Sequence, residues 1–540
     1  FYLQYLRTGH FKSVAEASQA GFVPRKPQRG SILDRRGRIL AASNLSRIVF
    51  ADPQMIEYPK EVAARLQPVI DQPGHIICRR IIEAGNPRYV PLKKNADPKE
   101  CEQAAKLPGV GVQSDWRRHY PTGSLLCHVV GFTSTDHRGL GGIELQYNDR
   151  LTGSAGRDRF YADVFRRPVR NRSSGKNHTD GKGMILTIDS AIQQFAREEL
   201  QKQFQEYKAA SAISIVADPA TGEILAMVSL PDFDPDKITS QDSGAMRNRA
   251  LTDPFEPGSL LKPIAAAIAI DEGAVTLDEK IYCEKGFYSG RGFGRISEYG
   301  HHAFGNISVA EILVKSSNIG MAKIGQKLGK EKLYRGLRRF GFGKKTGIDL
   351  PGEGTGLLRT PDKWTGYSVT RIPFGQEISA TAVQLVQAFC ILANGGKYVQ
   401  PHVVKAVVDD SGEPSVINRN APPVGYVIEP DVARDVVTKA LAEVVNRGTG
   451  TRAKLEKWQL FGKTGTAEIA KSTEQGYDDS AYVASFLAGA PAENPRLIVL
   501  VSIYKPDISL GKGYTGGTVA APVVKRIMKR SLEYLENSGN

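Results

Sequence analysis

The hydrophobic pattern of the chain changes at the polar, glycine-containing stretch 171–182, which predicts a linker. Upstream of it, the sequence is charged and rich in turn residues, with short strand-like runs such as 47–51 and 89–92. Downstream, hydrophobic periodicities are well marked. We therefore expect an N-terminal domain over residues 1–182 and a larger C-terminal domain over residues 183–540.

Strands and helices alternate in the predicted C-terminal domain. Continuous or alternating apolar runs indicate strands, and an apolar stripe at helical spacing indicates a helix. The expected strands are 184–188, 212–217, 224–229, 482–489 and 496–503, and the expected helices are 190–207 and 431–445. The turn at 218–222 has strong hairpin chemistry. Strands at both ends with helices between them predict one antiparallel sheet flanked by helices, an α+β fold.

Composition and charge narrow the class of protein. The 540 residues are 41% hydrophobic, which is enough to bury a sizeable core and argues against wholesale disorder. Lys plus Arg exceeds Asp plus Glu by 72 to 57, a net charge of +15. We expect no nucleic-acid binding, because the chain has neither zinc-finger spacing nor an RNP-like aromatic cluster. The five cysteines match no metal site and no redox pair, and their pairing stays open.

Membrane attachment depends on what precedes the chain. No apolar run approaches the roughly 18 residues that span a bilayer. The sequence opens on Phe1 rather than on methionine, so we expect that a signal sequence or a membrane anchor before residue 1 has been removed.

The first candidate motif places Ser259 and Lys262 at the start of a predicted helix. Pro257 and Gly258 make a turn before it, and the apolar run 264–270 continues it. Positions i and i+3 of a helix share one face, so the two side chains would be neighbours. A serine nucleophile needs a base, and burial can lower the pKa of a lysine enough for it to serve. The alternative is a capping serine and a solvated lysine.

The second motif, Ser316-Ser317-Asn318, follows the apolar positions of 309–313 at helical spacing. Ser316 continues that apolar stripe, so we expect its side chain to point inward. A buried hydroxyl and a buried amide need hydrogen-bonding partners. The alternative is a helix C-terminus with Ser and Asn in a turn.

The third motif is Lys463-Thr464-Gly465-Thr466. Lys463 offers a positive charge for a carboxylate, and Thr464 and Thr466 offer hydroxyls. Gly465 would let a substrate backbone approach closely, because it has no Cβ. The alternative is a strand end with a glycine bulge.

Together, these motifs have the forms S-x-x-K, S-x-N and K-T-G, the set found in penicillin-binding proteins and serine β-lactamases. Ser259 and Ser316 are 57 residues apart, and Ser316 and Lys463 are 147 residues apart. Ser317 stands where the S-D-N form has aspartate.

Over almost its entire length the chain resembles class B penicillin-binding proteins, and among these the FtsI-like septal transpeptidases. Beyond the three motifs, four segments carry this resemblance: an R-G-x-I-x-D-R-x-G match at 29–37, a pedestal-like motif at 118–144, G-Q-E-I-S at 375–379 and a C-terminal signature at 514–522. The resemblance implies a serine β-lactamase-like transpeptidase domain at 183–540 on an elongated, non-catalytic pedestal of the dimerisation type at 1–182. One departure is Leu260, where the family usually has threonine.

The resemblance also implies a role for each motif residue. Ser259 would form an acyl-enzyme with the penultimate D-Ala of a stem peptide, Lys262 would be the general base, and Ser316 would relay a proton to the leaving D-Ala. The backbone N–H groups of Ser259 and Thr466 would form the oxyanion hole. The substrate-binding residues would be Asn318, Lys463, Thr464, Gly465 and Thr466.

Partners and location follow from the same resemblance. It implies peptidoglycan stem peptides as substrates, β-lactams as inhibitors, and a SEDS-family glycosyltransferase such as FtsW and divisome proteins as partners. It implies a single-pass membrane protein with this chain on the periplasmic or extracellular side, and no cofactor. His301 and His302 invite a metal interpretation, but neighbours on an extended strand point to opposite sides, so we expect no metal site.

Three alternatives stay open. A serine β-lactamase shares the first and third motifs, but no E-x-x-L-N follows Asn318 to supply a deacylating carboxylate. A divisome scaffold with a vestigial site is a second alternative. The third keeps the chemistry but moves the enzyme to cell elongation or sporulation.

Overall fold

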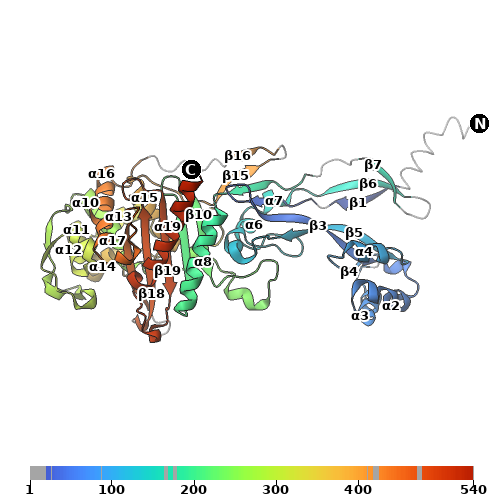
Figure 1. The fold of residues 1–540 in the computed structure, drawn as a ribbon, viewed down its shortest axis with the longest axis horizontal. Helices are drawn as coiled ribbons and strands as arrows, with labels where there is room; N and C mark the ends of the chain where they lie inside the picture. Colours follow the sequence, from blue (N-terminus) through green and yellow to red (C-terminus); the bar gives the residue numbers. More distant parts are fainter. Residues whose placement is uncertain are drawn as a thin grey trace, which may run out of the picture.

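The computed structural model describes residues 20–25, 27–86, 88–162, 168–173, 179–409, 412–416, 425–470 and 477–538. These residues form an elongated molecule (Figure 1). A broad body contains the central sheet, and an arm leads from it to a small head built from the helices α2, α3 and α4.

A five-stranded antiparallel sheet forms the centre of the body. Its strand order is β10-β9-β19-β18-β17, so the first hairpin of this region pairs with the last strands of the chain. The strands are β9 (Ser211–Ala217), β10 (Ile224–Leu230), β17 (Phe461–Ala470), β18 (Tyr477–Ala490) and β19 (Leu497–Tyr504). Strand β17 lies at one edge of this sheet.

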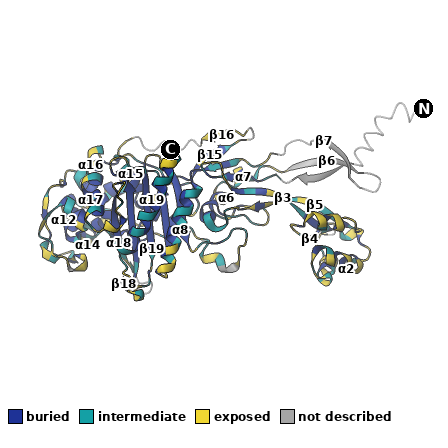
Figure 2. Ribbon diagram, in the orientation of Figure 1, coloured by how far each residue is buried: buried dark blue, intermediate teal, exposed yellow. Residues whose placement is uncertain are grey.

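Both faces of the sheet are buried (Figure 2), which explains why β9, β10 and β19 consist mainly of apolar residues. Successive side chains of a strand point to opposite faces. In β19, Ile498 and Leu500 join the core on one face, whereas Val499 and Val501 join the core on the other.

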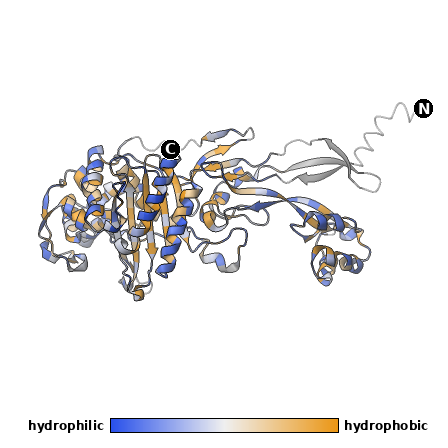
Figure 3. Cartoon of the chain, viewed as in Figure 1, coloured by the Kyte–Doolittle hydropathy of each residue, from blue (hydrophilic) through white to orange (hydrophobic). Residues whose placement is uncertain are grey.

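Helices cover the two faces. Helices α8 (Ser190–Glu206) and α19 (Ala521–Asn537) pack on one face, with their hydrophilic sides turned outward (Figure 3). The other face carries α15 (Ala382–Ala393), which is buried almost all round, and α17 (Ala442–Asn446). Helices α10 (Lys262–Asp271), α11 (Val309–Lys315), α12 (Asn318–Leu328) and α13 (Lys330–Arg339) complete that layer.

The arm is joined to the body by a shared sheet of order β16-β15-β8-β2-β3-β4, in which β5 also pairs with β3. The short β2 runs parallel to β8, and β8 pairs antiparallel with β15. The strands are β2 (Ile32–Leu33), β3 (Ile39–Ala51), β4 (Val90–Lys93), β5 (Val110–His119), β8 (Gly183–Leu186), β15 (Val404–Val408) and β16 (Pro414–Val416). Strands from both halves of the chain therefore form one continuous layer.

The head and a second small sheet complete the arm. The head packs α2 (Pro59–Ile70), α3 (Gly74–Ile82) and α4 (Pro98–Ala104) around their own apolar cluster. The small sheet orders β1 (Ala20–Arg25), β6 (Gly156–Ala162) and β7 (Pro168–Ser173) as β1-β6-β7.

A buried ion-pair group lies where the arm meets the body. The carboxylate of Glu144 is fully buried and accepts from Arg29 Nε at 2.5 Å and from Arg118 Nε at 2.6 Å. All three residues belong to segments that carried the resemblance in the N-terminal half. Two cations around one carboxylate hold β3, β5 and the following short helices together.

The predicted α+β fold is confirmed, and the expected strands and helices are present to within a few residues, except that β3 and β18 start eight and five residues before the expected positions 47 and 482. The helix expected at 431–445 contains a π-helical segment, Val436–Leu441, between α16 (Pro430–Asp435) and α17. The division at 182/183 stays a prediction, since β8 belongs to the sheet that both halves share. None of the described helices combines the length and the apolar character needed to cross a bilayer.

Candidate active site

Ser259 lies on a single helical turn that leads into a buried helix. The 3₁₀ turn Gly258–Leu261 passes directly into α10, with Pro263 in the first turn of α10. Proline is tolerated there because the first amides of a helix have no intrahelical partner. Lys262 begins α10 and is completely buried, as the S-x-x-K prediction required.

A second segment fixes the turn before Ser259. Gly375 adopts φ 87°, and a Cβ there would lie 2.1 Å from the carbonyl oxygen of Gly258. The amide of Gly258 donates to the carbonyl of Gly375 at 3.1 Å, and the amide of Glu377 donates to the carboxylate of Glu256 at 3.0 Å. The segment 375–379 thus holds the turn that carries Ser259 in place, and only glycine at position 375 allows so close an approach.

The S-x-N motif bridges two helices. Helix α11 ends at Lys315, and Ser316 takes a left-handed conformation with φ 60°. Ser317 then caps α12 by accepting from the amide of Gly320, at 2.9 Å. The expectation that Ser316 continues the helical stripe into the core is wrong: the turn points Ser316 toward Ser259 and places Ser317 in the core instead.

The K-T-G motif lies within the edge strand β17, where alternate side chains face opposite sides. Lys463 is completely buried, whereas Thr464 and Thr466 line the pocket. A Cβ on Gly465 would lie 2.8 Å from Cγ of Leu260, so this glycine lets strand β17 approach the turn that carries Ser259. The expected contact of Gly465 with a substrate backbone stays a prediction.

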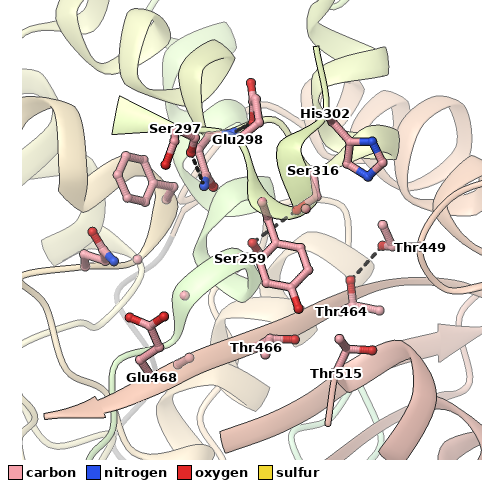
Figure 4. A pocket seen from close by; sticks show the side chains of 18 of the residues that line it. Ser259, Ser297, Glu298, His302, Ser316, Thr449, Thr464, Thr466, Glu468 and Thr515 are labelled. Carbon is pink, nitrogen blue, oxygen red and sulfur yellow. Dashed lines mark hydrogen bonds between the residues drawn. The ribbon is translucent and has the colours of Figure 1, made fainter. Parts of the chain in front are cut away.

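The three motifs meet at the hydroxyl of Ser316, whose hydrogen bond to Ser259 is drawn in Figure 4. Ser316 Oγ donates to Ser259 Oγ at 3.1 Å and lies 3.2 Å from Nζ of Lys262 and 2.9 Å from Nζ of Lys463. Lys262 Nζ also donates to the Ser316 carbonyl at 2.6 Å and to Asn318 Oδ1 at 2.7 Å. Within the described residues, Lys262 has no direct hydrogen bond to Ser259. Ser316 therefore stands between the two.

Burial changes the acid–base chemistry of both lysines. Loss of hydration lowers the pKa of Lys262 to about 7, against a weaker opposing effect of the Glu298 carboxylate. Burial also holds the pKa of Lys463 well below its ordinary value, and the neighbouring Lys262 pushes it further in the same direction. Near neutral pH the pair thus includes an amine that can accept a proton.

The motifs open into a pocket of about 550 Å³. On one side Thr464 Oγ1 lies 2.7 Å from Thr449 Oγ1, and Thr466 Oγ1 accepts from the amide of Gly516 at 3.1 Å (Figure 4). Thr515 also lines the pocket, so the C-terminal signature recognised in the sequence belongs to the site.

Several lining residues escaped the sequence analysis: Glu256, Arg295, Glu298, Tyr299, Arg371, Thr449 and Glu468. No periodicity or spacing marked them. Glu298, which is 6% exposed, lies in the glycine-rich stretch 285–302, which matches none of the motifs described above. Its carboxylate accepts from Ser317 Oγ and from the amide of Asn318.

No group of three His, Cys, Asp or Glu side chains in the described part of the chain is arranged to hold a metal ion. His302 stacks on Phe304 with a centroid separation of 5.5 Å, whereas the side chain of His301 lies outside the described residues. The five cysteines are free thiols.

Comparison with known proteins gives one consistent picture. Residues 212–529 match the model of the penicillin binding protein transpeptidase domain, and residues 24–186 match that of the penicillin-binding protein dimerisation domain. The chain is 35% identical to stage V sporulation protein D of Bacillus subtilis over 541 residues, which covers 99% of this chain and 82% of that protein. It is 30% identical to the peptidoglycan D,D-transpeptidase FtsI of Escherichia coli, covering 93% and 82% respectively.

A solved structure agrees with these matches. Penicillin binding protein 3 of Mycobacterium tuberculosis, in complex with aztreonam, superposes with a TM-score of 0.75 at 27% identity. The superposition covers 95% of this chain and 97% of that chain.

Proposed function

The chain belongs to the penicillin-binding protein transpeptidase family and has the class B architecture, and from this premise we propose that it cross-links peptidoglycan stem peptides through an acyl-enzyme on Ser259. The observation that carries this assignment is the meeting of Ser259, Lys262 and Lys463 around Ser316 Oγ at the base of one pocket.

Acylation begins with loss of the Ser259 proton. Neutral Lys262 has two N–H groups, which suit the Ser316 carbonyl and Asn318 Oδ1, and its lone pair is left for the Ser316 hydroxyl. Ser316 passes its proton to Lys262 and takes the proton of Ser259, so Ser259 Oγ can attack the carbonyl carbon of the penultimate D-Ala. The N–H groups of Ser259 and Thr466 are proposed to stabilise the oxyanion, and both residues line the pocket.

The same chain of groups then works in reverse. The proton held by Lys262 returns through Ser316 to the nitrogen of the terminal D-Ala, whose C–N bond breaks and leaves the Ser259 ester. The amine of a second stem peptide attacks this ester, forms the cross-link and restores the Ser259 hydroxyl. Within the protein, the proton moves along the Lys262–Ser316 and Ser316–Ser259 contacts of 3.2 and 3.1 Å, with the Ser316 hydroxyl turned toward Lys262.

Substrate binding uses both sides of the pocket. We propose that Asn318, on the side of Glu298, bonds the donor peptide and that the hydroxyls of Thr464 and Thr466, on the other side, bind its terminal carboxylate. Lys463 is buried behind these two threonines, 2.9 Å from Ser316 Oγ. It therefore acts on the carboxylate through the hydroxyl of Thr464, to which its Nζ donates at 3.4 Å, while Gly465 keeps strand β17 close to Leu260.

The cellular setting is proposed from the family. We propose attachment to the outer side of the cytoplasmic membrane and cooperation with a SEDS-family glycosyltransferase such as FtsW and with divisome proteins. The likeness to FtsI supports a role in division, and the likeness to a stage V sporulation protein supports the alternative. Filamentation on depletion would support division, spore-specific defects would support sporulation, and round cells would support elongation.

The test of the chemistry is intact-protein mass spectrometry after incubation with benzylpenicillin, followed by peptide mapping. We expect one stable adduct, on the peptide that contains Ser259. Ser259→Ala should form none, whereas Ser289→Ala, which removes an exposed hydroxyl from the hairpin of β12 (Phe287–Gly290) and β13 (Gly294–Ser297), should react like the wild type. A short-lived adduct with released, hydrolysed drug would identify a β-lactamase, and no adduct on folded protein would identify a vestigial site.

A further inference from the structure

Glu298 is a buried carboxylate that the mechanism above does not use. It follows β13 and lies beside Ser297, across the pocket from Thr464 and Thr466 (Figure 4). Only 6% of its surface is exposed. A carboxylate so far out of water is strongly unfavourable unless several donors compensate it.

Its donors all come from the start of α12. Glu298 Oε1 accepts from Ser317 Oγ at 2.5 Å and from the amide of Ile319 at 3.4 Å, and Oε2 accepts from the amide of Asn318 at 2.7 Å. The first amides of a helix lack intrahelical partners and carry partial positive charge, so a carboxylate fits there. Glu298 thus fastens the S-x-N motif from a separate segment of the chain.

The hydrogen bonds of Glu298 affect the position of Lys262 through the side chain of Asn318. Asn318 is held by its own amide on Glu298 and by its Nδ2, which donates to the Ser297 carbonyl at 3.0 Å. These two bonds fix the side-chain amide so that Oδ1 faces Lys262, which donates to it at 2.7 Å. Moving the start of α12 would move both Asn318 Oδ1 and the Ser316 groups that hold the amine.

We propose that Glu298 is a positioning residue of the transpeptidase reaction, which sets the place of Lys262 through Asn318 and supplies the negative charge that the buried lysine pair would otherwise lack. This inference rests on the proposed function. Glu298 touches neither the substrate nor Ser259 in the mechanism; it acts through the S-x-N motif.

The surrounding charges agree with this role. Lys262 from α10 and Lys463 from β17 converge on Ser316, and burial lowers the pKa of each. Glu298 is the charged group that acts in the opposite direction on Lys262, because its negative charge favours the ammonium form. Cys283 Sγ lies 3.6 Å from Ser317 Oγ, but burial raises the pKa of this thiol, so it stays uncharged near neutral pH.

The chain offers a matched control at Glu353, a buried carboxylate with the same kind of partners. It accepts from the amide and the hydroxyl of Thr346 and from the amide of Gly347, and it does not line the pocket. Replacing either glutamate with glutamine removes one buried charge from a hydroxyl and two amides. Only at Glu298 does one of the donor residues, Asn318, also contact a catalytic lysine, Lys262.

The experiment follows the second-order rate of acylation of the purified chain by benzylpenicillin as a function of pH. The drug has no group that titrates near neutral pH, so the midpoint of the profile reports the enzyme. For Glu298→Gln we expect the midpoint to move to lower pH by about 1 unit, because loss of a nearby negative charge disfavours the ammonium form. We also expect the plateau rate to fall on the order of tenfold, as Lys262 loses its alignment.

The control variants distinguish the effect of the Glu298 charge from its effect on the position of Lys262. Ser317→Ala removes the closest donor and keeps the carboxylate, so the rate should fall while the midpoint stays. Glu353→Gln should change neither. Glu298→Asp keeps the charge on a shorter side chain, so its midpoint should match the wild type and its rate should be reduced.

Two results would overturn the inference. One is a Glu298→Gln midpoint equal to that of the wild type in a protein that melts cooperatively, which would make Glu298 purely structural. If Glu298→Gln does not fold, the test passes to Glu298→Asp, where a full wild-type rate would show that the reach of the carboxylate is irrelevant. A wild-type chain that is not acylated at all would instead refute the proposed function itself.

Discussion

The pH dependence of acylation is the most specific prediction, since the proposed mechanism needs the amine of Lys262 to be neutral. Burial brings the pKa of this residue from an ordinary 10.5 to about 7. At neutral pH about half of the molecules then carry the free amine, on the order of 10³-fold more than for a solvated lysine. Because the neutral form is populated above the folded pKa, acylation should rise with pH through about 7 and then level off, changing about tenfold between one unit below and one unit above the midpoint.

The matching substitution is Lys262→Arg, which keeps a cation but cannot give up its proton. We expect the acylation rate at the plateau to fall by about 10²- to 10⁴-fold, the usual contribution of general-base catalysis. Rates would be measured with a fluorescent penicillin on protein whose folding is checked by thermal melting. Lys439→Arg, on an exposed lysine paired with Asp435, is the control. A flat wild-type profile, or rapid labelling of Lys262→Arg, would refute the assignment of Lys262 as the base.

Two further predictions test packing and the arm. Gly465→Ala puts a Cβ 2.8 Å from Cγ of Leu260, so we expect a loss of about 1–3 kcal/mol of stability and slower acylation; Gly305→Ala, where a Cβ meets nothing within 4 Å, should alter neither. Glu144→Ala leaves two buried arginines without their carboxylate, which should cost about 3–5 kcal/mol in thermal or denaturant unfolding, whereas the exposed Glu57→Ala should be neutral. Equal unfolding temperatures of Glu144→Ala and Glu57→Ala would contradict the second prediction.

Local patterns were sufficient for the elements of the body. The continuous apolar runs of β9, β10 and β19 could be recognised as strands because both faces of their sheet are buried, and the stripe of α8 because only one face is. The end of α11 was placed less well. Hydrophobic spacing continues through Ser316, but the left-handed turn there depends on Ser317 capping the next helix.

Some residues of the candidate site could likewise be found from local patterns, and others could not. Ser259, Lys262, Ser316 and Lys463 were identified because each belongs to a short motif that is visible in neighbouring residues of the sequence. Glu298 was missed because its role depends on contacts with residues 19 to 21 positions later, with strand β14 (Asn306–Ser308) and helix α11 in between. A single glutamate in a glycine-rich stretch carries no local pattern that would reveal such contacts.

By itself, the sequence determined which groups are present: a serine and a lysine one helical turn apart, a second serine with an asparagine, and a lysine on a strand followed by glycine. Periodicity determined the layers that carry them, because burial of apolar surface follows the repeat of each element. Only the tertiary structure decided that the three motifs converge on one hydroxyl, and that both lysines lose their water there. The pKa of a lysine depends on hydration and on nearby charge, and both are set by residues that are distant in the chain.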